Sequence, residues 1–247
     1  MPLHNQANLW QLISPALPIG AYHYSQGLEQ AVQRKWIRDR TDAAKWISEL
    51  LHHSVAYIDL PIIYRAHRCW NARDLAGLRS WDDVCRSYRE TSEMRDEEEA
   101  MGLALVRLAK ELGQPIPNWQ PGYVTAFSVF AANLGVFGMD TLSGYAWAWC
   151  ENQVLSATKL IPLGHTEGQR VLRDLIEQIP IAVERALACS DDDIGNRAPG
   201  LTLASMWHET QYSRVFRSLR NGHETGVESW DWWTGGSRKN NASGRVV

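Results

Sequence analysis

The sequence predicts an all-α protein, a single-domain bundle of about ten helices. Apolar residues recur at helical spacing throughout, and no run of strict apolar–polar alternation exceeds about five residues. Alanine and leucine, 25 residues each, outweigh the 27 valines and isoleucines together, which favours helices over strands. The ten prolines leave long proline-free windows in which helices can run. With 247 residues, of which 45% are apolar, the chain can bury one sizeable core.

The first segment, residues 12–32, is expected to be irregular before it becomes helical. Pro15, Pro18 and Gly20 restrict its backbone, and Ser25 is expected to cap the helix that follows. The aromatic cluster at 22–24 leaves two alternatives, since it either packs inward or presents a surface.

Two helices are expected between Thr41 and Leu112. Thr41 is expected to cap the first, and Ser80 resembles the start of a capping box for a second helix that runs unbroken to Leu112. Gly113 is placed to end that helix, and 114–122 is the clearest loop. The apolar stripe of the first helix consists of Ala43, Ile47, Leu50, Leu51 and Ile58.

The C-terminal half is expected to contain five further helical regions. Residues 124–134 are apolar enough to be buried on most sides, and 140–160 form a helix of about five turns. A capping box at 166–169 predicts the next helix, and the acidic run 191–193 suits a helix start. Residues 201–217 are expected to form the last helix.

Residues 1–218 are therefore expected to form one domain, and 219–247 a disordered C-terminal tail. Residues 221–247 contain five of the 18 glycines and three of the 12 tryptophans without helical periodicity. A partner-binding tryptophan cluster is the alternative interpretation of this segment.

Composition argues against several classes of function. The formal net charge of −3 gives no electrostatic basis for nucleic-acid binding. No apolar stretch is long enough to span a membrane, and no secretory signal is visible. The four cysteines form no CxxC pair, so we expect reduced thiols in a cytoplasmic protein.

No motif for catalysis or metal binding is complete. The chain lacks GxGxxG, a P-loop and HExxH. His52 and His53 are adjacent, so on a helix they point about 100° apart and cannot share a tetrahedral ion. We therefore expect neither catalytic residues nor metal ligands in this chain.

Carboxylates intrude on the apolar face of the helix that ends at Leu112. Glu90 and Glu97 lie within about 40° of the centre of its stripe, and Glu93 lies at the edge. They either form an intramolecular ion network, or this face meets another chain or lines a polar passage. The apolar stripe itself consists of Met94, Met101, Leu105, Leu108 and Leu112.

The helix at 140–160 has a similar polar seam. Gln153 lies in the middle of its apolar face, while Asn152, Ser156 and Lys159 follow one flank. Either these polar atoms bond to neighbouring backbone, with Lys159 reaching solvent, or a partner contacts the seam.

Four blocks of sequence resemble the signature blocks of UreF-type urease accessory proteins, in the same order. They are SPALPIGAYHYSQGLE (14–29), RETSEMRDEE (89–98), WCENQVLSATKLIPLGHTEGQR (149–170) and ASMWHETQYSRVFRS (204–218). The resemblance spans about residues 9–218. His165 and Trp207 depart from it, since glutamine and a polar residue are expected there.

This resemblance implies an all-α, non-catalytic, homodimeric chaperone of nickel insertion. Such proteins join UreD (also called UreH) and the GTPase UreG to load nickel into the urease apoenzyme. The resemblance implies no directly bound cofactor, since the complex handles the nickel. We expect the partner-binding residues to lie in the four blocks: Tyr24, Glu29, Glu90, Glu93, Arg95, Asn152, Gln153, Lys159, Tyr212, Arg214 and Phe216.

Two rival functions stay open at the level of the sequence. One is a dimeric all-α scaffold unrelated to metal delivery. The other is an all-α enzyme with Glu90, Glu93 or a histidine as acid–base group. Glu90 and Glu97 are two helical turns, about 10.5 Å, apart, which is too far for a retaining glycosidase pair.

Overall fold

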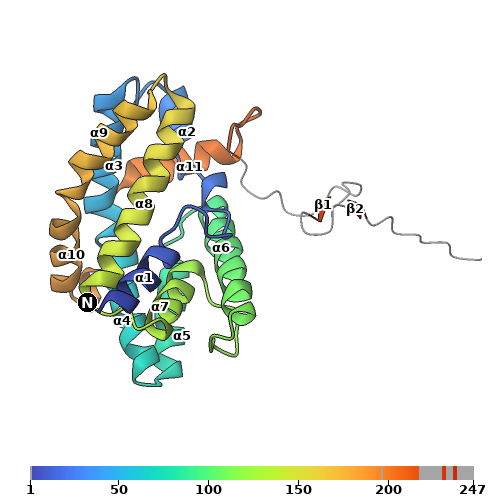
Figure 1. The fold of residues 1–247 in the computed structure, drawn as a ribbon. Coiled ribbons are helices and arrows are strands. Elements are labelled where there is room, and N and C mark those ends of the chain that lie inside the picture. Colours follow the sequence, from blue (N-terminus) through green and yellow to red (C-terminus); the bar gives the residue numbers. More distant parts are fainter. Residues whose placement is uncertain (1, 196, 217–229, 232–235, 238–247) are drawn as a thin grey trace, which may run out of the picture.

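The computed structural model describes residues 2–195, 197–216, 230–231 and 236–237 (Figure 1). Eleven α-helices form the described fold, so the prediction of an all-α bundle of about ten helices is confirmed. They are α1 (Leu3–Leu12), α2 (Leu28–Gln33), α3 (Arg40–Leu50), α4 (Asp59–Asn71), α5 (Leu75–Ser87), α6 (Ser92–Glu111), α7 (Tyr123–Asn133), α8 (Met139–Leu160), α9 (His165–Ile176), α10 (Ile179–Ala188) and α11 (Pro199–Glu209). Short 3-10 turns at Ala21–His23 and Asp191–Asp193 and a π-helical turn at Leu51–Val55 complete the helical structure.

The long helix α8 runs through the length of the bundle (Figure 1). α9, α10 and α3 pack along one side of it, while α4, α5, α6 and α7 form a second group that includes α4 packed on α7. Phe127 and Phe130 of α7 are fully buried where this group meets the rest of the core. The core cluster extends from Leu12 to Leu201, so both groups share one hydrophobic interior.

The helix predicted from Ser80 to Leu112 is in fact two helices, α5 and α6. The actual N-caps are Asp74, which accepts from the N–H of Gly77, and Thr91, which accepts from the N–H of Met94. Thr91 has an extended backbone, with φ −113° and ψ 159°, and this breaks the helix. The helix predicted after Thr41 is likewise capped by Asp39 instead.

Two further predicted helix boundaries are wrong for local reasons. The helix expected at Ser25 begins at Leu28, because Gln26 and Gly27 have positive φ angles of 49° and 78°. The capping box at 166–169 does not form, since α9 begins directly after Gly164 without a side-chain cap. Helix α1 was not predicted.

The chain ends its helical fold earlier than the sequence suggests. α11 ends at Glu209, not at residue 217, and 211–216 form a non-helical segment that we call the C-terminal hook. The predicted disordered tail, 219–247, lies outside the described residues except for an antiparallel pairing of β1 (Trp230–Asp231) with β2 (Gly236–Ser237). No helix in the described part of the chain is long and apolar enough to cross a membrane.

Candidate partner-binding site

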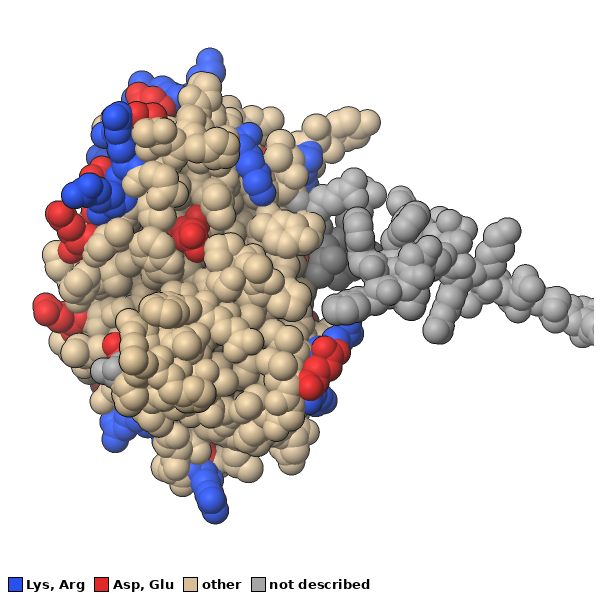
Figure 2. Space-filling model, viewed as in Figure 1, with Lys and Arg blue, Asp and Glu red and all other residues tan. Residues whose placement is uncertain are grey.

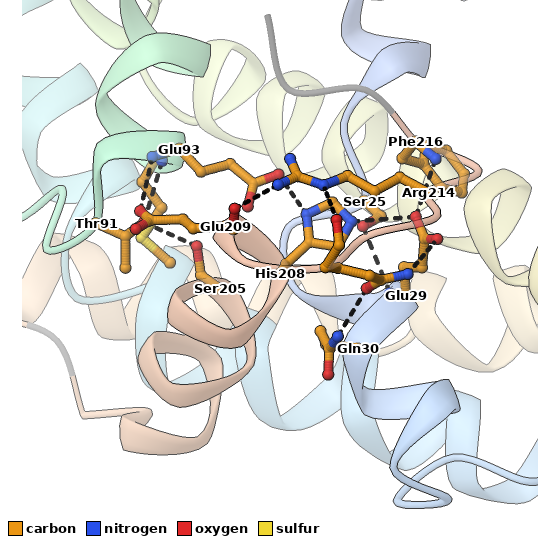
Figure 3. Close-up of polar contacts among 12 residues, drawn as sticks. Ser25, Glu29, Gln30, Thr91, Glu93, Ser205, His208, Glu209, Arg214 and Phe216 are labelled. Carbon is orange, nitrogen blue, oxygen red and sulfur yellow. Dashed lines mark hydrogen bonds and ion pairs between the residues drawn. The ribbon is translucent and has the colours of Figure 1, made fainter. Parts of the chain in front are cut away.

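The four signature blocks converge where α2, α6, α8 and α11 meet the C-terminal hook (Figures 1 and 3). α11 packs on both α2 and α6, and α2 packs on α8. Gly27 allows the closest approach, because a Cβ there would lie 3.0 Å from the Cβ of Ala204 in α11. Residues far apart in the sequence thereby form one polar junction.

Glu29 of α2 lies at the centre of this junction and is buried. Its carboxylate accepts hydrogen bonds from the backbone N–H groups of Val215 (2.8 Å) and Phe216 (2.9 Å) and from the side chain of Gln211 (2.9 Å). Nε2 of His208 lies 3.1 Å from Oε2 of Glu29, the same oxygen that accepts from Phe216. Burial raises the pKa of Glu29, but the bonds from His208 and the two N–H groups outweigh it, so the pKa lies below its ordinary value.

His208 of α11 bridges two carboxylates and is fully buried (Figure 3). Its Nδ1 lies 2.6 Å from Glu93 Oε1 and its Nε2 lies 3.1 Å from Glu29 Oε2. Burial lowers the pKa of His208, but the two carboxylates outweigh it and raise the pKa to about 9. The ring is therefore charged at neutral pH and donates from both nitrogens. Glu93 Oε2 is buried without a hydrogen-bond partner among the described residues.

Glu209, the last residue of α11, caps the first turn of helix α6. Glu209 Oε1 accepts from Ser92 Oγ (2.7 Å) and from the N–H of Glu93 (3.2 Å), while Thr91 and Ser205 share a hydrogen bond of 2.7 Å. Burial raises the pKa of Glu209, but the bonds from Ser92 and Glu93 lower it below its ordinary value. A carboxylate at a helix N-terminus also interacts favourably with the helix dipole. These contacts fix α11, and hence His208, against α6.

The hook anchors one aromatic residue and exposes two other apolar side chains. Phe216 is buried, and Lys159 Nζ of α8 lies 5.2 Å from the centre of its ring. Arg214 Nε donates to the carbonyl of Gln211 within the hook (3.0 Å). In contrast, Tyr212 is fully solvent-exposed and Val215 is 64% exposed.

The chain is similar over most of its length to urease accessory proteins. A family model described as UreF matches residues 37–176. The "Urease accessory protein UreF" of Alkalilimnicola ehrlichii is 44% identical over 218 residues, which cover 86% of this chain and 96% of that protein. Proteins of the same name from Chromohalobacter salexigens and Teredinibacter turnerae are 45% and 43% identical and cover 86% and 87% of this chain, and 94% and 100% of their own. This chain belongs to the UreF family of urease accessory proteins. The predicted resemblance to this family is thereby confirmed.

The polar seam of this UreF-family chain on α8 is bonded largely within the fold. Gln26 Oε1 accepts from Trp149 Nε1 (2.7 Å) and from Gln153 Nε2 (3.4 Å). Asn152 donates to the backbone carbonyl of Tyr24 (3.5 Å). Burial and then the charge of Glu97, Asp96 and Glu93 raise the pKa of Tyr24. Lys159 of this seam, which contacts Phe216 of the hook, is exposed to solvent.

The carboxylates that follow along α6 lie beside a partly open pocket. Glu97 accepts from Gln26 Nε2 (2.7 Å), and burial raises its pKa to about 8. Both residues line this pocket, which has a volume of about 160 Å³ and also touches Arg89. Arg89 pairs with Asp59 (2.5 Å) and Glu98 (2.8 Å), not with Glu93 as an i,i+4 pair would require. The ion network of this helix thus reaches across to α4.

The predicted site residues divide by exposure. Tyr24, Glu29, Glu93, Gln153 and Phe216 are buried in this chain, so their side chains are not accessible on its surface. Glu90 and Arg95 are exposed and lie outside the junction that contains His208. Glu90 accepts a hydrogen bond from Thr202 of α11, and Arg95 donates to the carbonyl of Arg89 (2.8 Å). Two predicted residues at the hook are exposed: Tyr212 within it and Lys159 of α8 beside it.

Sequence reasoning missed the bridging role of His208 and the central position of Gln26. A signal for His208 existed, because Leu201, Ala204, Ser205 and His208 are spaced i, i+3, i+4 and i+7 and all are buried. Gln26 has no such signal, since its position depends on a left-handed backbone. The described residues contain no group of three or more His, Cys, Asp or Glu side chains that could hold a metal ion.

Proposed function

We propose that this UreF-family chain is a cytoplasmic, non-catalytic adaptor that assembles with UreD (UreH) and the GTPase UreG. Together these proteins would deliver nickel into the active site of the urease apoenzyme. The complex, and not a site within this chain, would hold the nickel. An adaptor biases a GTPase between nucleotide states through differential contact, and it raises the effective concentration of cargo by tethering.

The observation that carries this proposal is the C-terminal hook beside Lys159. Its backbone is tied to α2 by buried hydrogen bonds, yet it exposes Tyr212 and Val215 to solvent. Tyrosine is enriched among residues that dominate protein–protein affinity, and a fixed backbone lowers the entropic cost of binding. A surface of this kind suits an assembly role.

A second surface supports assembly with another chain, and a second copy of this protein is our proposal for it. Figure 2 shows few charged side chains over α1 and the first half of α8. Leu3 and Trp10 of α1 are exposed there, together with Phe137 of the α7–α8 connection and Met139 at the start of α8. Asn5 of α1 donates to the carbonyl of Gly135 in this connection, which holds the two parts together. Exposed apolar patches of this kind mark interaction sites.

Co-expression of the chain with UreD and UreG, followed by affinity capture and light scattering, tests the proposal. The full chain and a version ending at residue 218 should both form a discrete three-protein complex, and the chain alone should have the mass of a dimer. If the folded chain captures neither protein, the adaptor function is refuted. The dimeric scaffold unrelated to metal delivery then becomes the better interpretation.

A further inference from the structure

One buried carboxylate determines the path of the C-terminal hook. The N–H groups of two consecutive residues, Val215 and Phe216, donate to Oε1 and Oε2 of Glu29. These contacts join positions 186 and 187 residues apart in the sequence. The side chain of Gln211 at the start of the hook donates to the same carboxylate. Both ends of the hook are therefore held by α2.

The carboxylate of Glu29 is also bound by the ring of His208. The ring donates to Glu29 and to Glu93 of α6, so α2, α6 and α11 meet through one buried cation. Hydrogen bonds to charged groups are stronger than neutral ones, and a carboxylate fixed on both sides cannot swing away from the hook. The orientation of Glu29, and with it the conformation of the hook, depends on this arrangement.

We propose that Glu29 is a positioning residue for partner binding, which keeps the C-terminal hook in the conformation that presents Tyr212 and Val215 to a partner protein. Glu29 itself is buried and touches no partner. The inference rests on the proposed function for the identity of that partner, UreD, but the anchoring of the hook can be measured in the chain alone.

Amide hydrogen exchange of the full chain, measured by NMR at neutral pH, tests the anchoring. In Glu29→Gln the side chain keeps one acceptor oxygen and loses its charge, so the N–H groups of Val215 and Phe216 should exchange roughly 10- to 100-fold faster than in the wild type. The matched control is Glu49→Gln, because Glu49 pairs with His53 at 3.3 Å on the surface. The control should leave both amides unchanged. Unchanged exchange in Glu29→Gln overturns the proposal.

A measurement on the wild type serves if Glu29→Gln does not fold. Nitrogen-15 NMR of the His208 ring at pH 7 should show both ring nitrogens protonated, as a bridge between two carboxylates requires. A neutral ring would mean that no cation fixes Glu29, and would overturn the proposal.

Binding to UreD decides whether the anchored conformation matters for assembly. Glu29→Gln and Tyr212→Ala should each weaken capture by at least about tenfold, while Glu49→Gln should bind like the wild type. A Glu29→Gln variant with a loosened hook and undiminished binding overturns the positioning role. If the wild type does not bind UreD, the proposed partner is wrong and the binding half of the inference fails with it, while amide exchange still decides whether Glu29 anchors the hook.

Discussion

Replacement of His208 by glutamine is expected to destabilise the chain by about 3 kcal/mol at pH 6. The imidazole is fully buried between Glu29 and Glu93, at 3.1 and 2.6 Å. Although burial lowers its pKa, the two carboxylates raise it from 6.5 to about 9. At about 1.4 kcal/mol for each pKa unit, the difference corresponds to about 3 kcal/mol of preferential binding of the proton by the folded state. Glutamine carries no charge and cannot supply this contribution.

The effect of this substitution should depend on pH with a definite sign. Because the folded pKa of His208 lies above the unfolded value, its contribution is complete below about pH 6.5 and is lost as the pH rises through about 9. Glu29 behaves in the opposite way: its folded pKa is lowered, so its contribution is present above the unfolded value of 4.5 and is lost in acid. The stability difference between wild type and variant should therefore be large at pH 6 and small at pH 9.5.

Urea unfolding followed by far-UV circular dichroism at pH 6, 7.5 and 9.5 measures this difference. His53→Gln is the control, because His53 pairs with Glu49 at the surface and exposed pairs contribute about 1 kcal/mol at most. A loss below about 1 kcal/mol at pH 6 for His208→Gln would refute the reasoning. An equal loss at pH 6 and pH 9.5 would show that the histidine acts by packing and not by charge.

Three other substitutions test separate features. Lys159→Ala should leave the circular dichroism spectrum and melting temperature nearly unchanged, since the cation–π contact of the exposed lysine with the Phe216 ring contributes only about 0.5–1 kcal/mol. The variant should nevertheless lower urease activation in cells, and an unfolded variant would contradict the prediction. Glu97→Gln should be more stable than the wild type by more than about 1 kcal/mol at pH 8 and equally stable at pH 4, because burial raises the folded pKa of Glu97 to about 8 and ionisation of Glu97 opposes folding as the pH rises. Equal urea midpoints of the two proteins at pH 8 would count against this prediction. Gly102→Ala should destabilise the chain by about 1–3 kcal/mol in thermal unfolding, because the new Cβ would lie 2.7 Å from the carbonyl oxygen of Pro121. An unchanged melting temperature would show that the backbone at Pro121 moves away from the new Cβ at no cost.

Local sequence patterns predicted the helices whose boundaries depend on local chemistry. Residues 124–134 and 140–160 were expected to be helical, and α7 and α8 span Tyr123–Asn133 and Met139–Leu160. Gly113, expected to end a helix, has a left-handed φ of 69° directly after α6. In each case the apolar residues of the helix and the residue that ends it are close together in the sequence.

Two of the errors lie where a distant carboxylate acts on the segment in addition to its local backbone geometry. Residues 80–112 have the pattern of one helix, but the break before α6 lets Arg89 reach Asp59, 30 residues earlier in the chain. Residues 211–216 also have the pattern of a helix, but two of their backbone N–H groups donate to Glu29 and not to carbonyls of a helical turn. Neither Asp59 nor Glu29 lies within the stretch of sequence that it contacts.

The candidate site was predictable as a set of residues but not as an arrangement. Position on the helical wheel correctly marked Glu93 and Glu97 as facing the interior. It also placed Glu90 near the apolar stripe, but Glu90 precedes the start of α6 and is exposed. The ion network of this region is not confined to one helix, because Arg89 pairs with Asp59 of α4.

Charge at the junction explains why residues of the four blocks meet there. Glu29, Glu93, His208 and Lys159 come one from each block, and three of them are buried. Buried ion pairs offset much of their Coulomb energy by desolvation, so apolar residues of similar volume would often stabilise the fold as well. Apolar contacts, however, lack direction, whereas a carboxylate that binds two consecutive N–H groups permits one path of the backbone. For a protein whose proposed task is to present a surface, this directionality is the contribution that matters, and the His208→Gln and Glu29→Gln variants separate it from net stability.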